Sequence, residues 1–392
     1  MTPALSIIIP TRDRSAYLGH AIRACTANPE SSLEILVLDN ASVDGTREVV
    51  ERIADHRVRY VRSDVRLSMR DNFEKGIATS RGDVLLFIGD DDGVFSFTVA
   101  AALDLFHRMK VSAVSAARAH YFWPDIVTAR RNAGLLPRGE GAAVRDARAV
   151  LRRVLTDGDY YRLPCLYHGF VKRDLVDRVL RRQGRFFLSS QVDMFSAIAL
   201  SMEGIDYAFS EAPLVINGGS SRSNGASHFG GGTDTEKGLW RREDDLGFLP
   251  GFADSLTVGS LVVESALRYA AHNPPSTLGD ILDVGDVEVT LAIEAARRTA
   301  AGRSQAEIDQ LFATAGIGER TEPARGARRR PNRVSRLVRS FLKTRPIDLG
   351  RQSISNVYDA ARYMQGLRSE RRVGLLSDPI GQAKAAVRVA RG

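Results

Sequence analysis

Cysteines and long apolar runs are both scarce in this sequence, and each scarcity excludes a class of protein. The 392 residues include two cysteines, Cys25 and Cys165, so the sequence offers neither a disulfide framework nor the paired spacing of a zinc site. No stretch approaches the roughly 20 consecutive apolar residues that a membrane-spanning helix needs. The first ten residues carry no charge before their apolar run, so we expect no secretory signal there. These absences favour a soluble, cytoplasmic protein.

Positive charge is distributed unevenly along the chain. The 55 Lys and Arg exceed the 47 Asp and Glu, which gives a formal net charge of +8, but residues 325–345 alone hold nine Lys or Arg and no acid. Without that segment the rest of the chain carries a charge of −1. The body of the protein is therefore not basic, which argues against a nucleic-acid-binding face on it.

Strand and helix patterns alternate over the first ninety residues. Buried runs typical of strands lie at 5–9, 33–38, 58–61 and 84–88, and amphipathic segments that predict helices lie at 14–28, 46–53 and 72–80. Thr46 is the expected N-cap of the second helix. Strands separated by helices imply a parallel sheet with right-handed crossovers. The expected fold is α/β, with a mostly parallel central sheet flanked by helices and a helical C-terminal extension.

The second half of the chain is less regular. Helical patterns lie at 147–155, 173–182, 192–202, 286–299 and 306–312. A Gly/Ser-rich stretch at 218–232 has no apolar pattern and predicts either a functional lid or a disordered loop. We expect a catalytic domain at 1–235, with halves at 1–110 and 111–235, then a mainly helical extension at 236–320 and a basic, helical tail at 321–392.

Polar clusters follow two of the predicted strands. Asp39 and Asn40 follow the second strand, and Asp90, Asp91 and Asp92 follow the fourth. Open parallel sheets bind ligands beyond the carboxyl ends of their strands. Three adjacent carboxylates repel one another, and a divalent cation that prefers oxygen ligands would relieve that repulsion and bridge substrate phosphates. The alternative is a solvated turn that caps the next helix.

Three segments, in order and spacing, resemble motifs of the family 2 glycosyltransferases. Residues 6–14 (SIIIPTRDR) resemble the opening strand and turn of that family, and residues 34–46 (EILVLDNASVDGT) resemble its second strand. Residues 82–92 (GDVLLFIGDDD) resemble the segment that carries its metal motif, although Gly89 stands where many relatives have an acid. The resemblance covers residues 4–100 and fades up to about residue 230.

This resemblance implies a Rossmann-like nucleotide-diphospho-sugar transferase fold and an inverting transfer from a nucleotide-diphosphate sugar, by default a UDP-sugar. It also implies a divalent cation, Mn²⁺ or Mg²⁺, as cofactor. The donor nucleotide would contact Pro10, Thr11, Arg12, Asp39, Asn72, Asp90 and Asp91, with Asp39 at the base or ribose. The cation would be held by Asp90 and Asp92, with His228 completing its coordination shell.

Inverting transfer needs a base that takes the proton of the acceptor hydroxyl. Asp193 occupies the place where the family has its catalytic E-D-like pair, with Val192 replacing the Glu, and is the implied base. The alternative is that Asp193 only stabilises a helix N-terminus. His168 would contact the acceptor unless it is structural, and Arg222 would neutralise the leaving diphosphate unless its loop is disordered.

Residues 332–345 place apolar side chains on one helical face and Arg or Lys on the remainder. Such a helix either lies on an anionic membrane surface or packs its apolar stripe on the catalytic domain. The membrane alternative would suit a glycan or lipid-linked acceptor and a peripheral location on the inner face of the membrane. The helical C-terminal third could also supply a homodimer contact.

Together these features predict an inverting glycosyltransferase of cell-surface polysaccharide or glycolipid synthesis. A sugar nucleotidyltransferase would need a Gly-rich loop after the first strand, and a phosphotransferase with an Asp nucleophile would need a carboxylate there. Pro10 and Thr11 stand at that position instead. A non-catalytic nucleotide-sugar binder or membrane-associated scaffold of the same fold is the alternative from another class.

Overall fold

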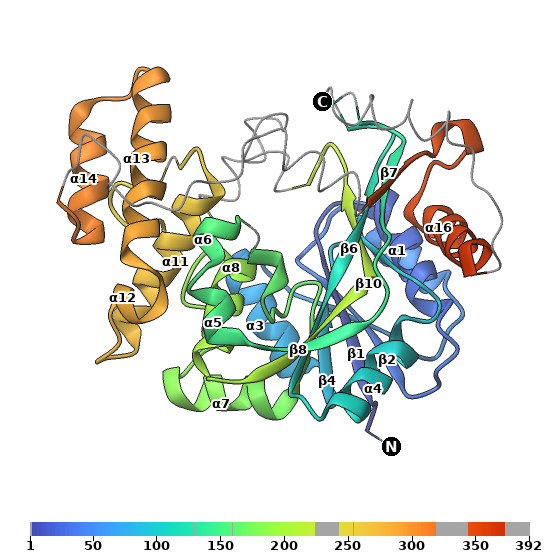
Figure 1. Ribbon diagram of the computed structural model, residues 1–392. Coiled ribbons are helices and arrows are strands. Elements are labelled where there is room, and N and C mark those ends of the chain that lie inside the picture. The colour runs from blue at the N-terminus through green and yellow to red at the C-terminus, as the bar shows by residue number, and fades with distance from the viewer. Residues whose placement is uncertain are drawn as a thin grey trace.

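The computed structural model describes residues 2–372 apart from positions 127, 129, 159 and 254 and the segments 224–242 and 319–343. A mixed sheet of 11 strands forms the centre, with helices on both faces and a further group of helices at one side (Figure 1). The predicted α/β class, with a helix-flanked sheet and a helical C-terminal extension, is confirmed.

The strands are β1 (Leu5–Thr11), β2 (Leu33–Asp39), β3 (Val58–Arg62), β4 (Val84–Phe87), β5 (Gly93–Val94), β6 (Ala113–Phe122), β7 (Ala133–Pro137), β8 (Ala142–Asp146), β9 (Phe170–Lys172), β10 (Asp206–Gly219) and β11 (Thr344–Asp348). The α-helices are α1 (Ser15–Thr26), α2 (Thr46–Glu51), α3 (Met69–Thr79), α4 (Thr98–Met109), α5 (Ala147–Leu151), α6 (Val154–Asp157), α7 (Arg173–Gln183), α8 (Val192–Met202), α11 (Val258–His272), α12 (Leu278–Ile281), α13 (Val284–Ala300), α14 (Gln305–Ala315) and α16 (Val357–Arg372). Two short 3₁₀ turns lie at η1 (Tyr160–Arg162) and η2 (Gly350–Gln352).

The first four strands form a parallel core. β1 pairs in parallel with β2 and β4, and β2 pairs in parallel with β3. Helices α1, α2 and α3 return the chain between these strands, as a parallel connection requires. Because β9 runs antiparallel between β4 and β6, the sheet becomes mixed beyond this core, in the order β11-β7-β6-β9-β4-β1-β2-β3. β10 pairs in parallel with β6 and antiparallel with β5 and β8.

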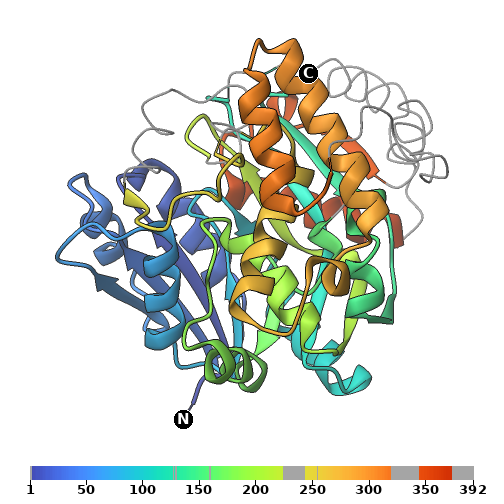
Figure 2. The same cartoon turned by 90° about the vertical axis from the view of Figure 1, so that its left-hand side faces the viewer.

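Both faces of the parallel core are covered, which explains why its strands are apolar on both sides. Ile7 and Ile9 of β1 belong to a buried cluster with residues of α1 and α4. Ile8, which points to the opposite face, belongs to a second cluster with residues of α3, α7 and α8. That second cluster continues into α11, α13 and α14, which Figure 2 shows in front of the sheet. The C-terminal helices are therefore joined to the sheet by one apolar core.

The end of the described chain returns to the first helix. β11 pairs antiparallel with the edge strand β7, and Val357, Ala360 and Met364 of α16 are fully buried in a cluster that also contains Tyr17 of α1. Figure 1 shows α16 beside α1, on the side of the sheet away from α13 and α14. Most of the predicted basic helix at 332–345 lies outside the described residues, and its last two residues, Thr344 and Arg345, belong to β11.

Local predictions differ from the structure at three places. Gly45, rather than Thr46, is the N-cap of α2, and Thr46 is the first helical residue. The segment 147–155 forms two short helices, α5 and α6, because the chain turns at residues 152–153. The stretch 218–232 begins as the end of β10, and its part beyond residue 223 lies outside the described residues. Among the described helices, none is both long enough and apolar enough to cross a membrane.

Candidate functional site

The carboxyl ends of β1 and β4 lie side by side and bring the predicted donor residues together. These strands are parallel neighbours in register at Ile8 and Phe87, so the residues that follow them meet at one edge of the sheet. The Thr11 hydroxyl donates to Asp90 Oδ2 at 2.7 Å. Asp39 ends β2 directly opposite Thr11. The sheet thus places Thr11, Asp39 and Asp90 at a common edge.

Asp90 and Asp91 share one partly buried arginine. Arg14 Nη1 lies 2.8 Å from Asp90 Oδ1, and Arg14 Nη2 lies 3.5 Å from Asp91 Oδ2. The hydroxyls of Ser220 and Ser223 also donate to Asp91 Oδ2, at 2.6 and 2.5 Å. Burial raises the pKa of Asp90 to about 7, and the adjacent carboxylates add to the rise although Arg14 opposes it. Burial would lower the pKa of Arg14, but the two carboxylates raise it.

Asp92 is enclosed by hydrogen-bond donors. Its Oδ2 accepts from the Tyr167 hydroxyl at 2.8 Å and from the backbone N–H of Gly89 at 2.6 Å, and it lies 2.6 Å from His168 Nε2. Its Oδ1 accepts from the backbone N–H of Gly218 at 2.6 Å. Burial would raise the pKa of Asp92, but His168 and the N–H donors lower it to about 2. Burial also lowers the pKa of His168, although Asp92 opposes that shift. The structure places His168 inside the acid cluster, and its contact with an acceptor sugar stays a prediction.

Asp39 is also enclosed, with an exposed fraction of 1%. Its Oδ1 accepts from the backbone N–H of Ser42 at 2.8 Å, and its Oδ2 accepts from the Tyr60 hydroxyl. Arg62 Nε lies 3.5 Å from the same Oδ2. The carboxylate therefore fixes the loop after β2, and contact with a nucleotide base or ribose stays a prediction.

Pro10 and Arg12 flank Thr11 at the end of β1, on the predicted donor side. The Arg12 guanidinium forms an ion pair with Glu243, and Arg66 Nη1 lies 3.9 Å from the other oxygen of that carboxylate. Glu243 belongs to the segment that follows residue 242 and is only partly exposed. An anionic ligand that binds Arg12 would therefore compete with Glu243.

The other predicted contacts lie in different surroundings. Asn72 is buried on α3, and its amide oxygen has no hydrogen-bond partner among the described residues. Arg222 donates from Nη1 to the backbone carbonyl of Asp13, in the turn between β1 and α1. His228 lies outside the described residues. The contact of Asn72 with a donor stays a prediction, and Arg222 holds the turn beside the donor edge.

Asp193 is the second residue of α8 and is partly exposed. Its Oδ2 accepts from the Tyr160 hydroxyl at 2.7 Å. The thiol of Cys165 donates to the backbone carbonyl of Asp193 at 3.3 Å, and Tyr167 and His168, a little further along the chain, bind Asp92. The segment 165–168 therefore connects the start of α8 to the acid cluster. The role of base stays a prediction.

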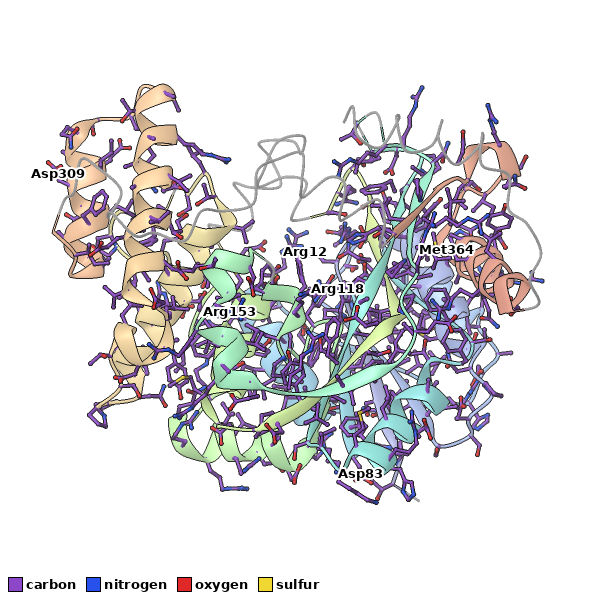
Figure 3. All side chains as sticks on the ribbon, in the orientation of Figure 1. Arg12, Asp83, Arg118, Arg153, Asp309 and Met364 are labelled. Carbon is purple, nitrogen blue, oxygen red and sulfur yellow. The ribbon has the colours of Figure 1, made fainter. Side chains whose placement is uncertain are left out.

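Arg118 of β6, which no motif of the sequence marked, contacts the segment that holds Asp92. Its guanidinium carbon lies 3.8 Å above the ring of Tyr161, and Nη2 donates to the backbone carbonyl of Tyr167 at 3.3 Å. Its Nη1 is buried and has no hydrogen-bond partner within the described ranges. Figure 3 shows Arg118 near the middle of the molecule. No local motif marks Arg118, whereas Arg14, also missed, lies inside the first resembling segment.

The acid cluster offers few free oxygens to a divalent cation. Asp90 Oδ1 is buried and accepts no hydrogen bond, although Arg14 lies against it, and Asp91 is the adjacent oxygen donor. Both oxygens of Asp92 are already used by donors, which counts against its predicted role as a ligand. Across the described parts of the chain, no group of three or more His, Cys, Asp or Glu is arranged to hold a metal ion.

Comparison with known proteins identifies the segment that carries this edge of the sheet. Residues 6–155 match the family model described as "Glycosyl transferase family 2". This match, called the family 2 segment below, covers less than half of the chain. The resemblance of the three motifs is thereby confirmed, and the family 2 segment contains β1–β4, the acid cluster and Arg118.

Curated relatives match a shorter part of the chain. The GalNAc(5)-diNAcBac-PP-undecaprenol beta-1,3-glucosyltransferase of Campylobacter jejuni is 32% identical over 97 residues, which are 24% of this chain and 31% of that protein. The abequosyltransferase RfbV of Salmonella typhimurium is 30% identical over 101 residues, which are 24% of this chain and 30% of that protein. The chain thus spans less than a third of each of these relatives.

A solved structure aligns over a longer range at low identity. The crystal structure of S. aureus TarS 1-349 in complex with UDP-GlcNAc aligns with 82% of this chain and 97% of that chain, with 13% identity and a TM-score of 0.45. The fold is therefore defined by the strand order and pairing described above.

Proposed function

We propose that this chain is a glycosyltransferase that moves a sugar from a nucleotide-diphosphate donor, by default a UDP-sugar, to a hydroxyl group of a glycan or lipid-linked acceptor. One observation carries the proposal. The segment 165–168 contacts both parts of the proposed site, because Tyr167 and His168 bind Asp92 and the thiol of Cys165 donates to the backbone carbonyl of Asp193 at 3.3 Å. The match of residues 6–155 to the model of glycosyl transferase family 2 supports the same reaction class.

Asp193 is the proposed base in a single inverting displacement. Its Oδ2 would take the proton of the acceptor hydroxyl, and the hydrogen bond from Tyr160 would hold the carboxylate in place. Arg12 and the amide oxygen of Asn72 would contact the donor, Arg12 after exchanging Glu243 for a phosphate. A divalent cation, held by Asp90 and Asp91, would supply positive charge for the departing diphosphate.

A lipid-linked acceptor is supported by the Campylobacter relative, which is named for a PP-undecaprenol substrate. We extend this to synthesis of a cell-surface polysaccharide or glycolipid, with a cytoplasmic protein that lies peripherally on the inner face of the membrane. The membrane contact would use residues 332–345, and vesicles with anionic lipid should then retain the full chain at low salt. Homodimer formation is a separate prediction, and light scattering of the full chain would test it.

The donor site is tested by thermal-shift binding of UDP, GDP, dTDP and CMP, each with Mn²⁺ and with a chelator. We expect one diphosphate to raise the melting temperature in the presence of the cation. Turnover is then measured with the sugars of that nucleotide and a panel of glycan acceptors, and product NMR reports the anomeric configuration. Absence of any nucleotide-dependent shift would refute the donor site.

The alternative is a nucleotide-sugar binder without catalysis. Such a protein would show the same thermal shift but no turnover and no slow hydrolysis of the bound donor. The partly exposed Asp193 favours the enzyme, because a buried structural cap would have no route to an acceptor proton.

A further inference from the structure

Arg14 stands where a cation would approach the acid cluster. Its side chain is 16% exposed, and its guanidinium lies against Asp90 Oδ1 at 2.8 Å and Asp91 Oδ2 at 3.5 Å. Nη2 also lies 3.3 Å from the Ser220 hydroxyl, and the guanidinium carbon lies 5.6 Å from the ring centre of Tyr17. The start of α1 therefore brings a permanent positive charge to two buried carboxylates.

The hydrogen bonds of the cluster show which oxygens remain for a ligand. The Thr11 hydroxyl donates to Asp90 Oδ2, and the hydroxyls of Ser220 and Ser223, which follow β10, donate to Asp91 Oδ2. Asp92 has donors on both oxygens. Asp90 Oδ1 is the cluster oxygen that is buried without a hydrogen bond, and Arg14 faces it. A cation that coordinates Asp90 Oδ1 would meet the guanidinium directly.

We propose that Arg14 is a built-in counter-ion of Asp90 and Asp91, and that a divalent cation binds these carboxylates only by displacing its guanidinium. The inference rests on the proposed function, because it concerns the cation of that donor site. A guanidinium and a divalent ion within a few ångströms of each other repel strongly in a buried site. Arg14 therefore weakens cation binding in the free protein, and a diphosphate donor, by adding negative charge, would favour the exchange.

The test is a titration of the full chain with Mn²⁺, in which electron paramagnetic resonance measures the free ion without nucleotide or acceptor. In Arg14→Gln the competing charge is gone, and we expect the Kd for Mn²⁺ to fall at least about tenfold. Arg23→Gln on the same helix is the matched control, because Arg23 is exposed, and its Kd should equal that of the unaltered chain. In the double variant Arg14→Gln, Asp90→Asn, the gain in Mn²⁺ affinity should be abolished.

Equal Kd values in the unaltered chain and in Arg14→Gln would overturn the proposal, as would weaker binding in the variant. If Arg14→Gln does not fold alone, folding upon addition of Mn²⁺ supports the proposal. If it stays unfolded with Mn²⁺, Arg14→Lys decides, because one ammonium holds two carboxylates less well and should lower the Kd severalfold. An unchanged Kd in Arg14→Lys then overturns it. Since no donor or turnover enters this titration, its result is separate from the test of the proposed function.

Discussion

Replacing Asp92 by Asn should destabilise the fold more than replacing Asp90, although both carboxylates are 1% exposed. Asp92 is held by two backbone N–H groups and two side chains, which connect the end of β4 to Gly218 of β10 and to the loop before β9. An Asn side chain offers one acceptor oxygen, so at least one of the two backbone donors would face an NH₂ group.

The expected cost follows from the donors that Asp92 satisfies. The backbone N–H donors, together with His168, lower the pKa of Asp92, so the folded state prefers the carboxylate. Because a buried donor left without an acceptor costs about 1–3 kcal/mol, we expect Asp92→Asn to lower the free energy of unfolding by about 1–3 kcal/mol at pH 7. In contrast, the pKa of Asp90 is raised to about 7, so its charge is unfavourable there, and Asp90→Asn should cost less than about 1 kcal/mol.

Urea unfolding at pH 7 measures both variants in a buffer with chelator. Trp123 is a suitable fluorescence probe, because it is buried and its Nε1 donates to the Asp91 carbonyl at 2.9 Å. Equal losses in the two variants, or an Asp92→Asn variant as stable as the unaltered chain, would refute the reasoning. If Asp92→Asn kept its stability but lost Mn²⁺ binding, Asp92 would be a cation ligand, as the sequence predicts.

Three further predictions concern the candidate base Asp193, the imidazole of His120 and the helix α16. Asp193→Asn should lower turnover by roughly 10²- to 10⁴-fold while nucleotide binding by calorimetry stays unchanged, and near-normal turnover would exclude Asp193 as the base. Burial, with nearby positive charges, lowers the pKa of His120 to about 4, so only the unfolded chain takes up this proton between about pH 6.5 and pH 4. Stability should therefore fall as pH falls through that range, and urea melts of His120→Phe should show a shallower fall; an identical slope would contradict this. Met364→Ala should cost about 2–5 kcal/mol in the same melts, because Met364 is 0% exposed, whereas the exposed Arg362→Ala should cost little.

The parallel core could be predicted because its signals are local. β1, β2 and β4 contain the uninterrupted apolar runs 7–10, 35–38 and 84–87, and that pattern is set by burial on both faces of the sheet. The edge at which Thr11, Asp39 and Asp90 meet follows from parallel pairing alone, so the predicted donor edge required no information on distant contacts.

The contacts within the site could not be predicted, because they join distant segments. Asp92 binds the N–H of Gly218, which is 126 positions later, and a β10–β6 pairing brings that group into reach. Arg118 is one residue of a long strand whose pattern shows burial but not function. β11 and α16 follow a basic segment that suggested a tail, and their place is decided by the uncovered edge of β7 and the apolar side of α1.

The return of β11 and α16 to the first half of the molecule has a consequence during synthesis. β7 is made about 200 residues before its partner β11, which at roughly 5–20 residues per second is a delay of roughly 10–40 s. Until then the nascent chain exposes an unpaired strand edge and the aromatic side chains of Tyr121 and Trp123. A ribosome-bound chain that already contains every motif of the family 2 segment would thus still be open to aggregation. Expression of a version that stops before β11 should therefore depend on chaperones more than expression of the full chain does.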